Sequence, residues 1–499
     1  MEQIYLRELR RKVDDQYVGL RPNGNKLKPV HMAGGEFRKI VGKIYNTEQI
    51  KRFTYVINAK GMTPIGNDLE SIMEMLKESD AIDNSVKKED VESLRKVLQD
   101  ILGADNGVFY NRNSRVHDGM VSFSAGSRYF LTGKATYEEN GEFIASIIET
   151  CCPDLTAYVR DILSKADDPI SILISPVSSD ETIDDDYTGV KSETFELFKM
   201  ESREVEAFIS SVQVGGTHLL NNFKQNKNFL SQLRMFNFFC IYTLIRYMSM
   251  LEAFYCEDGH IRPLLVDFTS KIGSGRLSSV ANASMMSYTL IHSSIARFYA
   301  WAYAQQLKEY TIEELLDSDC PRYDMNKTRQ MAELEQMWDI AKDEAKDLTV
   351  ENDKYFVFGK YIYEMLALES DSSPVNFMKN IGVRGGLLYP LDPQHPHKRF
   401  VFSQDIIEMV IRCCVDPGDI LSREELRTRL WQIMGIVIGG SGNDIMNLEK
   451  NGMILQVDSD SLESNFESFA EQLQEMGFAE MLADGILQIR LNNDSYDKE

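Results

Sequence analysis

The chain has 499 residues, of which 43% are hydrophobic and 26% are charged. These fractions are typical of folded globular proteins, and they exclude a wholly disordered, a collagen-like or a disulfide-scaffold chain. Since one domain takes about 150 residues, the length predicts roughly two to four domains. The formal net charge of −23 disfavours a protein that binds nucleic acid by electrostatic attraction alone.

Residues 1–176 alternate helical and extended patterns, which predicts an α+β domain that begins with a basic segment. Helix starts are indicated by Asn67 and Pro153, and a helix end by Gly103. Helices are expected over residues 36–45, 67–79, 87–103, 142–152 and 153–164. Strands are expected over residues 53–59, 108–111, 120–125 and 170–176.

Residues 177–192 are rich in aspartate and glutamate and show no apolar period. Their carboxylates could be pictured as ligands of a calcium or magnesium ion, but they lack the spacing and the closing glutamate of a calcium-binding loop. We therefore interpret this segment as a solvated acidic linker that marks a domain boundary.

Residues 193–380 have an almost entirely helical pattern, which predicts a helical bundle domain. In the most apolar stretch, residues 228–256, only 11 residues separate Arg234 from Arg246, fewer than the roughly 20 needed to cross a bilayer. Apolar side chains on nearly every face predict that this stretch is a buried helix at the centre of the bundle. Further helices are expected over residues 280–307, 327–347 and 353–369.

Residues 381–499 are predicted to form an acidic, winged-helix-like domain. Two short strands flank the loop LDPQHPH, and a hairpin is expected over an Asp484-Gly485 turn. Ser403 is a predicted helix cap, and Ser422 and Glu425 form a predicted capping box. A short strand is expected over residues 436–438, and helices over residues 403–414, 422–435, 443–452 and 462–477. The fold class is therefore mainly α, multidomain, with an α+β N-terminal domain and a helical central bundle.

Charge is unevenly distributed along the chain. Residues 1–60 carry 13 Lys or Arg against 6 Asp or Glu, a net charge of +7, whereas residues 401–499 carry 7 against 19, a net charge of −12. These ends could bind each other, a second copy or different partners, or they could be ordinary solvated faces. The basic residues of the first segment are candidate contacts to an anion or a nucleic acid: Arg10, Arg11, Lys12, Arg38, Lys39 and Lys43.

The seven cysteines include two adjacent pairs but no C-x-x-C motif. Zinc clusters and secreted disulfide frameworks need more regular spacing, so we expect reduced thiols in a cytoplasmic protein. The charged, helical pattern of the first residues is unlike a signal peptide.

Two glycine-rich segments could hold a phosphate group. Residues 435–445 lack the lysine of a P-loop, and a turn explains them better. Residues 273–279 precede a helix, and Arg276 could act as the charge partner of an anion bound at its N-terminus. Arg276 is therefore a further candidate contact.

Residues typical of metal sites and active sites lack the required spacing. His395 and His397 lie in a proline-rich loop, which we interpret as a stiff hairpin loop. Glu344 and Lys346 match the E-x-K of restriction-type nucleases, but their side chains would diverge on a helix. Residues 115–130 lack the serine elbow of hydrolases. We therefore predict no catalytic residue, no metal ligand and no cofactor.

The run FVFSQDIIEMVIRCCVDPGDILSREELRTRLWQIMGIVIGG has the order helix, acidic turn, helix and G-I-V strand. In this order it resembles the tail of the DptG family of phosphorothioation-dependent restriction proteins. Similar tails occur in accessory subunits of bacterial anti-phage operons that work beside a HerA-type ATPase. The resemblance covers about the last 100 residues and carries over no catalytic residue. It implies a non-enzymatic defence-complex subunit that couples recognition to an ATPase or nuclease partner.

A winged helix that binds DNA places Lys and Arg on its recognition helix and wing. Here the helix expected over residues 443–452 has Asp444 and Glu449 against Lys450, and the hairpin is also acidic. We therefore expect this surface to bind protein in preference to DNA. The sequence therefore favours a non-enzymatic adaptor or scaffold subunit of an intracellular bacterial complex, plausible in anti-phage defence, without a membrane segment. Two alternatives stay open: a metal-dependent nuclease or hydrolase, and a DNA-binding regulator that uses the basic N-terminal segment.

Overall fold

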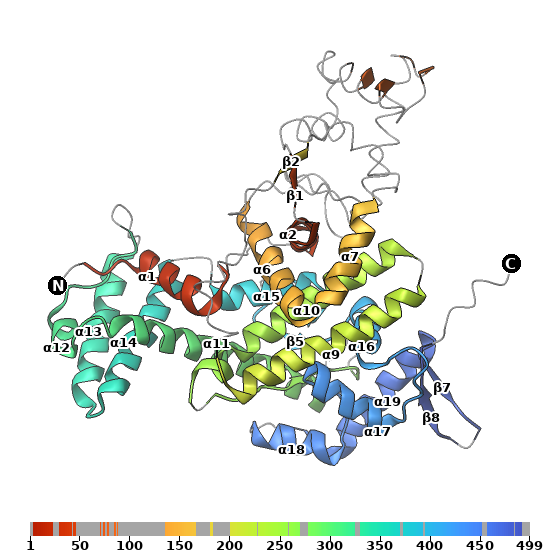
Figure 1. The fold of residues 1–499 in the computed structure, drawn as a ribbon. Helices are drawn as coiled ribbons and strands as arrows, with labels where there is room; N and C mark the ends of the chain where they lie inside the picture. Colours follow the sequence, from red (N-terminus) through yellow and green to blue (C-terminus); the bar gives the residue numbers. More distant parts are fainter. Residues whose placement is uncertain are drawn as a thin grey trace. The chain divides into compact units, whose positions relative to one another are not determined.

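The structure is a computed structural model, and it is mainly helical with a few short strands (Figure 1). Among the described residues there are fifteen α-helices, and all eight strands pair in two-stranded sheets. The residues that the structure describes are 3–22, 29–41, 43–45, 70, 73–74, 77–78, 84–85, 87, 135–165, 180–182, 200–226, 228–257, 259–269, 278–324, 330–369, 373–392, 395–451, 457–483 and 485–491.

The helices are α1 (Leu6–Val13), α2 (Pro29–Val41), α6 (Ala135–Cys151), α7 (Pro153–Lys165), α9 (Arg203–Gln225), α10 (Phe229–Tyr255), α11 (Ser279–Leu307), α12 (Ile312–Asp317), α13 (Met331–Asp347), α14 (Glu351–Glu369), α15 (Pro374–Arg384), α16 (Gln404–Cys414), α17 (Arg423–Arg429), α18 (Gly442–Lys450) and α19 (Ser459–Glu475). Two π-helical turns, η1 (Asp14–Val18) and η5 (Leu430–Met434), directly follow α1 and α17. The strands are β1 (Lys43–Tyr45), β2 (Asp180–Thr182), β3 (Leu264–Leu265), β4 (Leu388–Tyr389), β5 (Arg399–Phe400), β6 (Ile436–Val437), β7 (Ala479–Met481) and β8 (Leu487–Ile489).

Most predicted elements within the described residues are confirmed. The Ser403 side chain caps α16, and Ser422 and Glu425 form the capping box of α17. The strands β4 and β5 pair in an antiparallel manner, and the predicted hairpin is formed by β7 and β8. Gly485 has a φ of 80°, a left-handed conformation that glycine adopts at little cost. Local capping and turn signals were therefore sufficient to predict these elements.

The sequence prediction differs from the structure near residue 42. A helix was expected over residues 36–45, but α2 ends at Val41 and Lys43–Tyr45 form β1. Gly42 disfavours a continuous helix, and β1 pairs with β2, which lies inside the predicted acidic linker. The elements expected over residues 53–59, 87–103, 108–111, 120–125 and 170–176, and most of 67–79, lie outside the described residues.

The chain divides into two compact units, and their bounds differ from the predicted domain boundaries. Unit 1 contains Met1–Lys26, Lys191–Gly215 and Thr243–Glu499, and unit 2 contains Leu27–Val190 and Gly216–Tyr242. The predicted bundle range from residue 243 onward and the predicted C-terminal domain therefore belong to one unit.

The helix α10 is buried along most of its length, as its sequence predicts. Its aromatic and aliphatic residues leave little polar surface, and Tyr247 is completely buried. In the part of the chain that the structure describes, no helix combines the length and hydropathy that a bilayer crossing requires.

In unit 1, α11 and α14 pack closely at a glycine. A Cβ atom on Gly359 would lie 2.1 Å from the carbonyl oxygen of Ala300, so only glycine permits this approach. Trp338 of α13 is 1% exposed and lies against Phe358, with 5.0 Å between the ring centroids. These aromatic contacts fill the space between the helices.

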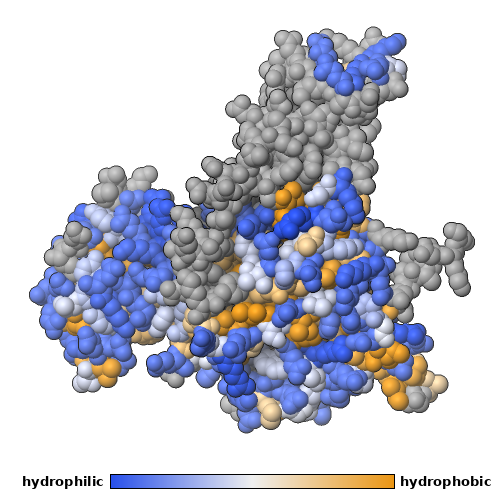
Figure 2. All heavy atoms as spheres, viewed as in Figure 1, coloured by the Kyte–Doolittle hydropathy of each residue, from blue (hydrophilic) through white to orange (hydrophobic). Residues whose placement is uncertain are grey.

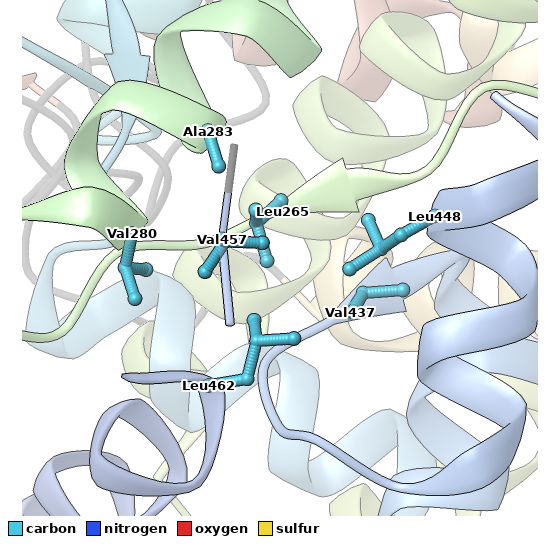
Figure 3. Close-up of a cluster of buried hydrophobic side chains, with 7 residues drawn as sticks. All are labelled: Leu265, Val280, Ala283, Val437, Leu448, Val457 and Leu462. Atoms are coloured by element: carbon cyan, nitrogen blue, oxygen red, sulfur yellow. The ribbon is translucent and has the colours of Figure 1, made fainter. Parts of the chain in front are cut away.

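A second core region of unit 1 surrounds the parallel pair β3 and β6. Asn465 of α19 is completely buried and connects both strands. Its amide nitrogen donates to the carbonyl oxygens of Val266 at 2.8 Å and Ile438 at 2.7 Å, and its oxygen accepts from the Phe268 N–H at 2.7 Å. The apolar side chains around the strands come from β3, α11, β6, α18, α19 and the residue Val457 (Figure 3): Leu265, Val280, Ala283, Val437, Leu448, Val457 and Leu462.

In unit 2, α2 packs on α6 through Gly141, whose Cβ would lie 2.1 Å from the Met32 carbonyl oxygen. Glu36 is buried beside Asn237 and Cys240. With the Asn237 amide group oriented so that its nitrogen faces Glu36, that nitrogen donates to both carboxyl oxygens at 3.1 Å. Burial raises the pKa of Glu36 well above its usual value because it penalises the charged form.

Candidate functional site

The three basic candidates on α1 all face carboxylates of unit 1. The Arg10 guanidinium lies 3.4 Å from Asp14, and that of Arg11 lies 3.9 Å from Asp15. The Lys12 ammonium lies 3.4 Å from a carboxylate oxygen of Glu309. These positive charges are therefore matched within the chain, which lowers their attraction for a phosphate group.

The other anion candidates lie outside α1. Lys39 is a half-buried residue of α2 in unit 2. Arg38 of α2 and Lys43 of β1 have side chains outside the described part of the structure, and Arg276 itself lies outside the described residues.

One buried carboxyl group anchors the N-terminal segment, residues 3–22, in unit 1. Asp14 is 2% exposed and accepts a hydrogen bond from the Tyr299 hydroxyl at 3.2 Å. Burial raises the pKa of Asp14 to about 7, although the neighbouring Arg10 lowers it. The next turn is fixed by Tyr247, whose hydroxyl donates to the Val18 carbonyl at 2.7 Å.

The histidine loop has an internal hydrogen bond. The His397 backbone N–H donates to Nδ1 of His395 at 3.3 Å. In the described ranges, no group of three or more histidine, cysteine, aspartate or glutamate side chains could hold a metal ion. All seven cysteines are free thiols.

The E-x-K tripeptide lies on α13, as its helical period predicts. Lys346 forms an ion pair with Asp343 at 3.0 Å, and Glu344 accepts a hydrogen bond from Tyr361 at 3.0 Å. The glycine-rich segment 435–445 forms the end of η5, β6 and the start of α18. Each of these motifs therefore has a structural explanation.

The C-terminal hairpin is joined to the preceding helices by a short strand contact. Leu421, between α16 and α17, forms an antiparallel bridge with Ile489 of β8. The Leu421 N–H donates to Ile489 at 2.8 Å, and the Ile489 N–H donates back at 2.9 Å. Since β8 pairs with Leu421 on one side and with β7 on the other, β7 is the outer strand of this small sheet among the residues that the structure describes.

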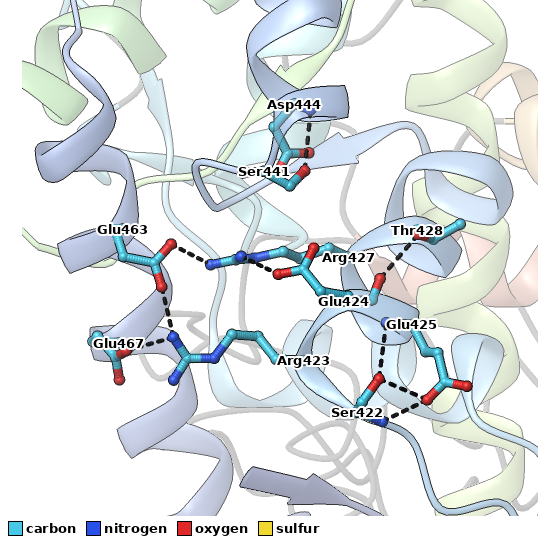
Figure 4. Close-up of polar contacts among 10 residues, drawn as sticks. All are labelled: Ser422, Arg423, Glu424, Glu425, Arg427, Thr428, Ser441, Asp444, Glu463 and Glu467. Atoms are coloured by element: carbon cyan, nitrogen blue, oxygen red, sulfur yellow. Dashed lines mark hydrogen bonds and ion pairs between the residues drawn. The ribbon is translucent and has the colours of Figure 1, made fainter. Parts of the chain in front are cut away.

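Two arginines of α17 hold α19 in place (Figure 4). The Arg427 side chain is 6% exposed, forms an ion pair with Glu463 at 2.6 Å and lies 4.1 Å from the Phe466 ring centroid. Arg423 forms ion pairs with Glu463 and Glu467, both at 2.6 Å. These charge-assisted contacts, together with the apolar face of α19, fix the helix next to the hairpin.

The N-terminus of α18 lies beside this cluster. A Cβ atom on Gly439 would lie 2.6 Å from Nε of Arg427, so the glycine leaves room for the guanidinium group. Asp444 and Ser441 form the capping box of α18. Burial raises the pKa of Asp444 to about 6.

The helix α19 has an acidic outer surface. It carries five acidic residues and no lysine or arginine. Glu463 and Glu467 are paired with the arginines of α17. Asp460, Glu471 and Glu475 are exposed, and within the described residues they form no ion pair. The unmatched charge of this helix is therefore negative.

The hairpin exposes large apolar side chains, and so does Ile420, which precedes Leu421. Ile420 is 57% exposed, Met481 is 44% exposed and Ile486 is 52% exposed. Figure 2 shows apolar residues gathered over the β7 and β8 region. Exposed apolar side chains that lie close together on a folded protein are typical of an interaction surface.

Sequence reasoning missed the residues that assemble this region. Asn465 reads as an ordinary polar residue of α19, yet it is completely buried. Its position between Leu462 and Phe466, on the apolar face of the helix, is the one local signal that could have indicated burial. The partners of Arg427 on α19 carry no comparable signal.

Comparison of the chain with protein-family models and with curated protein sequences finds no match.

Proposed function

We propose that this chain is a non-enzymatic adaptor subunit of a bacterial cytoplasmic multiprotein complex, and that its C-terminal region binds a protein partner. The observation that carries the proposal is the surface formed by α19 and the β7–β8 hairpin. It combines exposed carboxylates with exposed apolar side chains at Ile420, Met481 and Ile486. Such a surface repels a polyanion and suits a protein partner.

A winged-helix-like arrangement of the C-terminal region is part of this proposal. The order α16, Leu421, α17, α19, β7 and β8, with the bridge from Leu421 to β8, supports it. In this arrangement α19 directly precedes the hairpin and occupies the place of the recognition helix, with α18 inserted before it. Because α19 has no lysine or arginine, this helix is suited to contact with a protein.

The resemblance to DptG-like accessory subunits supports a role in anti-phage defence beside a HerA-type ATPase or a nuclease. The DNA-binding alternative has less support, because Arg10, Arg11 and Lys12 are matched by carboxylates. The seven free thiols are compatible with a reducing compartment.

Native pull-down of the tagged full-length chain from its host, followed by mass spectrometry, tests this proposal. We expect a co-purifying protein in a fixed ratio and no nucleotide release from DNA when the pure chain is incubated with magnesium or manganese. A chain that purifies alone and degrades DNA under these conditions would contradict the adaptor function and support the hydrolase alternative.

A further inference from the structure

The outer strand of the C-terminal sheet has backbone groups that face away from its partner strand. The Arg490 N–H donates to the Phe478 carbonyl at 3.0 Å, and the Leu482 N–H donates to the Ile486 carbonyl at 2.9 Å. In an antiparallel pair, residues alternate between those that bond inward and those that face outward. Ala479 and Met481 therefore direct their backbone groups to the outer side of β7.

An apolar side chain of β7 is exposed at this edge. Met481 is 44% exposed, and Ile486, which follows the turn of the hairpin on the side of β8, is 52% exposed. An edge of this kind can accept one more strand, whose alternate side chains contact the exposed apolar groups.

The charge next to the edge indicates the chemistry of that strand. The helix α19 packs against β7, and its exposed Glu471 and Glu475 belong to the turns that lead into the strand. The last 99 residues carry 19 acidic against 7 basic residues. Electrostatic complementarity therefore favours a segment with lysine or arginine.

We propose that the outer edge of β7 binds an extended segment of a partner protein in which apolar residues alternate with lysine or arginine. This inference rests on the proposed adaptor function and names the partner's chemistry. The added strand pairs with Ala479 and Met481, its apolar side chains lie on the face of the sheet that carries Met481, and its basic side chains lie on the opposite face, which carries Glu480.

Fluorescence anisotropy with the full-length chain tests the inference. The probes are a short labelled peptide of alternating valine and lysine and a matched peptide of alternating valine and glutamate. We expect the lysine peptide to bind at least about tenfold more tightly than the glutamate peptide, since opposite charges meet at the edge. Equal affinities of the two peptides, or no binding of the lysine peptide, would overturn the inference. This comparison uses the wild-type chain alone, so it does not depend on the folding of any variant.

The double variant Met481→Lys, Ile486→Lys locates the binding surface. We expect it to weaken binding of the lysine peptide at least about tenfold, whereas Ile340→Lys, at a 46% exposed position of α13, leaves binding unchanged. Equal effects of the two variants would contradict a specific edge. Sedimentation of the wild-type chain as a dimer that the hairpin variant dissociates would assign the surface to a second copy.

The same variants separate this inference from the adaptor function. If the hairpin variant still retains its partner in the native pull-down, the adaptor function stands and the surface assignment is wrong. If the lysine peptide binds at the edge but no partner is captured, the edge stands and the adaptor function loses its support.

Discussion

The N-terminal segment, residues 3–22, and the C-terminal region of α19 and its hairpin are both charged, but they use their charges differently. Each is anchored in unit 1 by a buried polar residue, Asp14 in the first and Asn465 in the second. Arg10, Arg11 and Lys12 face carboxylates, whereas Glu471 and Glu475 form no ion pair within the described residues.

This difference teaches that net charge along the sequence does not identify a binding surface. A charge that is matched inside the chain contributes little to the attraction of a partner, and a charge that is not matched remains available. The C-terminal region also exposes Met481 and Ile486, which adds an apolar contact to the unmatched charge. The two regions can be compared further by four substitutions or sets of substitutions.

The largest effect on stability is expected for Asn465→Leu. The change leaves two buried carbonyl groups and one half-buried N–H without their partner, which should lower the free energy of unfolding by about 3 to 5 kcal/mol. Chemical denaturation followed by tryptophan fluorescence measures this, because all three tryptophans, Trp301, Trp338 and Trp431, belong to unit 1. The exposed neighbour Ser464→Ala should change the free energy of unfolding by less than about 0.5 kcal/mol.

The N-terminal anchor should make the stability of unit 1 depend on pH. The pKa of Asp14 is raised to about 7 in the folded chain, so the folded state binds this proton more tightly than the unfolded state. The contribution is therefore fully present below about pH 4 and is lost as the pH rises to about 7, by at most about 4 kcal/mol.

Denaturation of the wild type and of Asp14→Asn between pH 4 and pH 8 measures this contribution. We expect the wild type to lose more stability than the variant as the pH rises, whereas Glu8→Gln, at an exposed position of α1, behaves like the wild type. The same slope in the wild type and Asp14→Asn would show that Asp14 titrates normally, and the buried anchor would need another explanation.

A smaller effect is expected for the double variant Arg11→Ala, Lys12→Ala. The ion pairs that it removes are exposed, so the free energy of unfolding should fall by no more than about 1 kcal/mol. Retention of the full-length chain on immobilised DNA at low salt should not change. A clear loss of retention would contradict the comparison and favour the DNA-binding regulator.

The smallest effect on stability is expected for the double variant Glu471→Lys, Glu475→Lys. Both residues are exposed, and neither forms an ion pair within the described residues. The free energy of unfolding should therefore change by less than about 0.5 kcal/mol. Partner retention in the native pull-down should nevertheless fall, because the charge that faces a basic segment is reversed. Full retention of the partner would mean that the acidic face is an ordinary solvated surface.

The sequence by itself determined the local elements and the charge of the candidate site. Signals within a few residues predict the caps at Ser403 and Ser422, the buried helix α10 and the hairpin whose turn contains Gly485. Caps, periodicity and turns act over short distances, so the local sequence is sufficient to specify them. The acidic character of the hairpin region was equally visible in the composition.

Only the tertiary structure decided which charges are matched and which strand is the outer one. The pairing of Lys12 with Glu309, the bridge from Leu421 to Ile489 and the burial of Asn465 between two strands all join residues far apart in the chain. No local pattern specifies such contacts, because their energies depend on how separate helices pack. The candidate surface is therefore acidic by sequence, and its accessible edge is a consequence of packing.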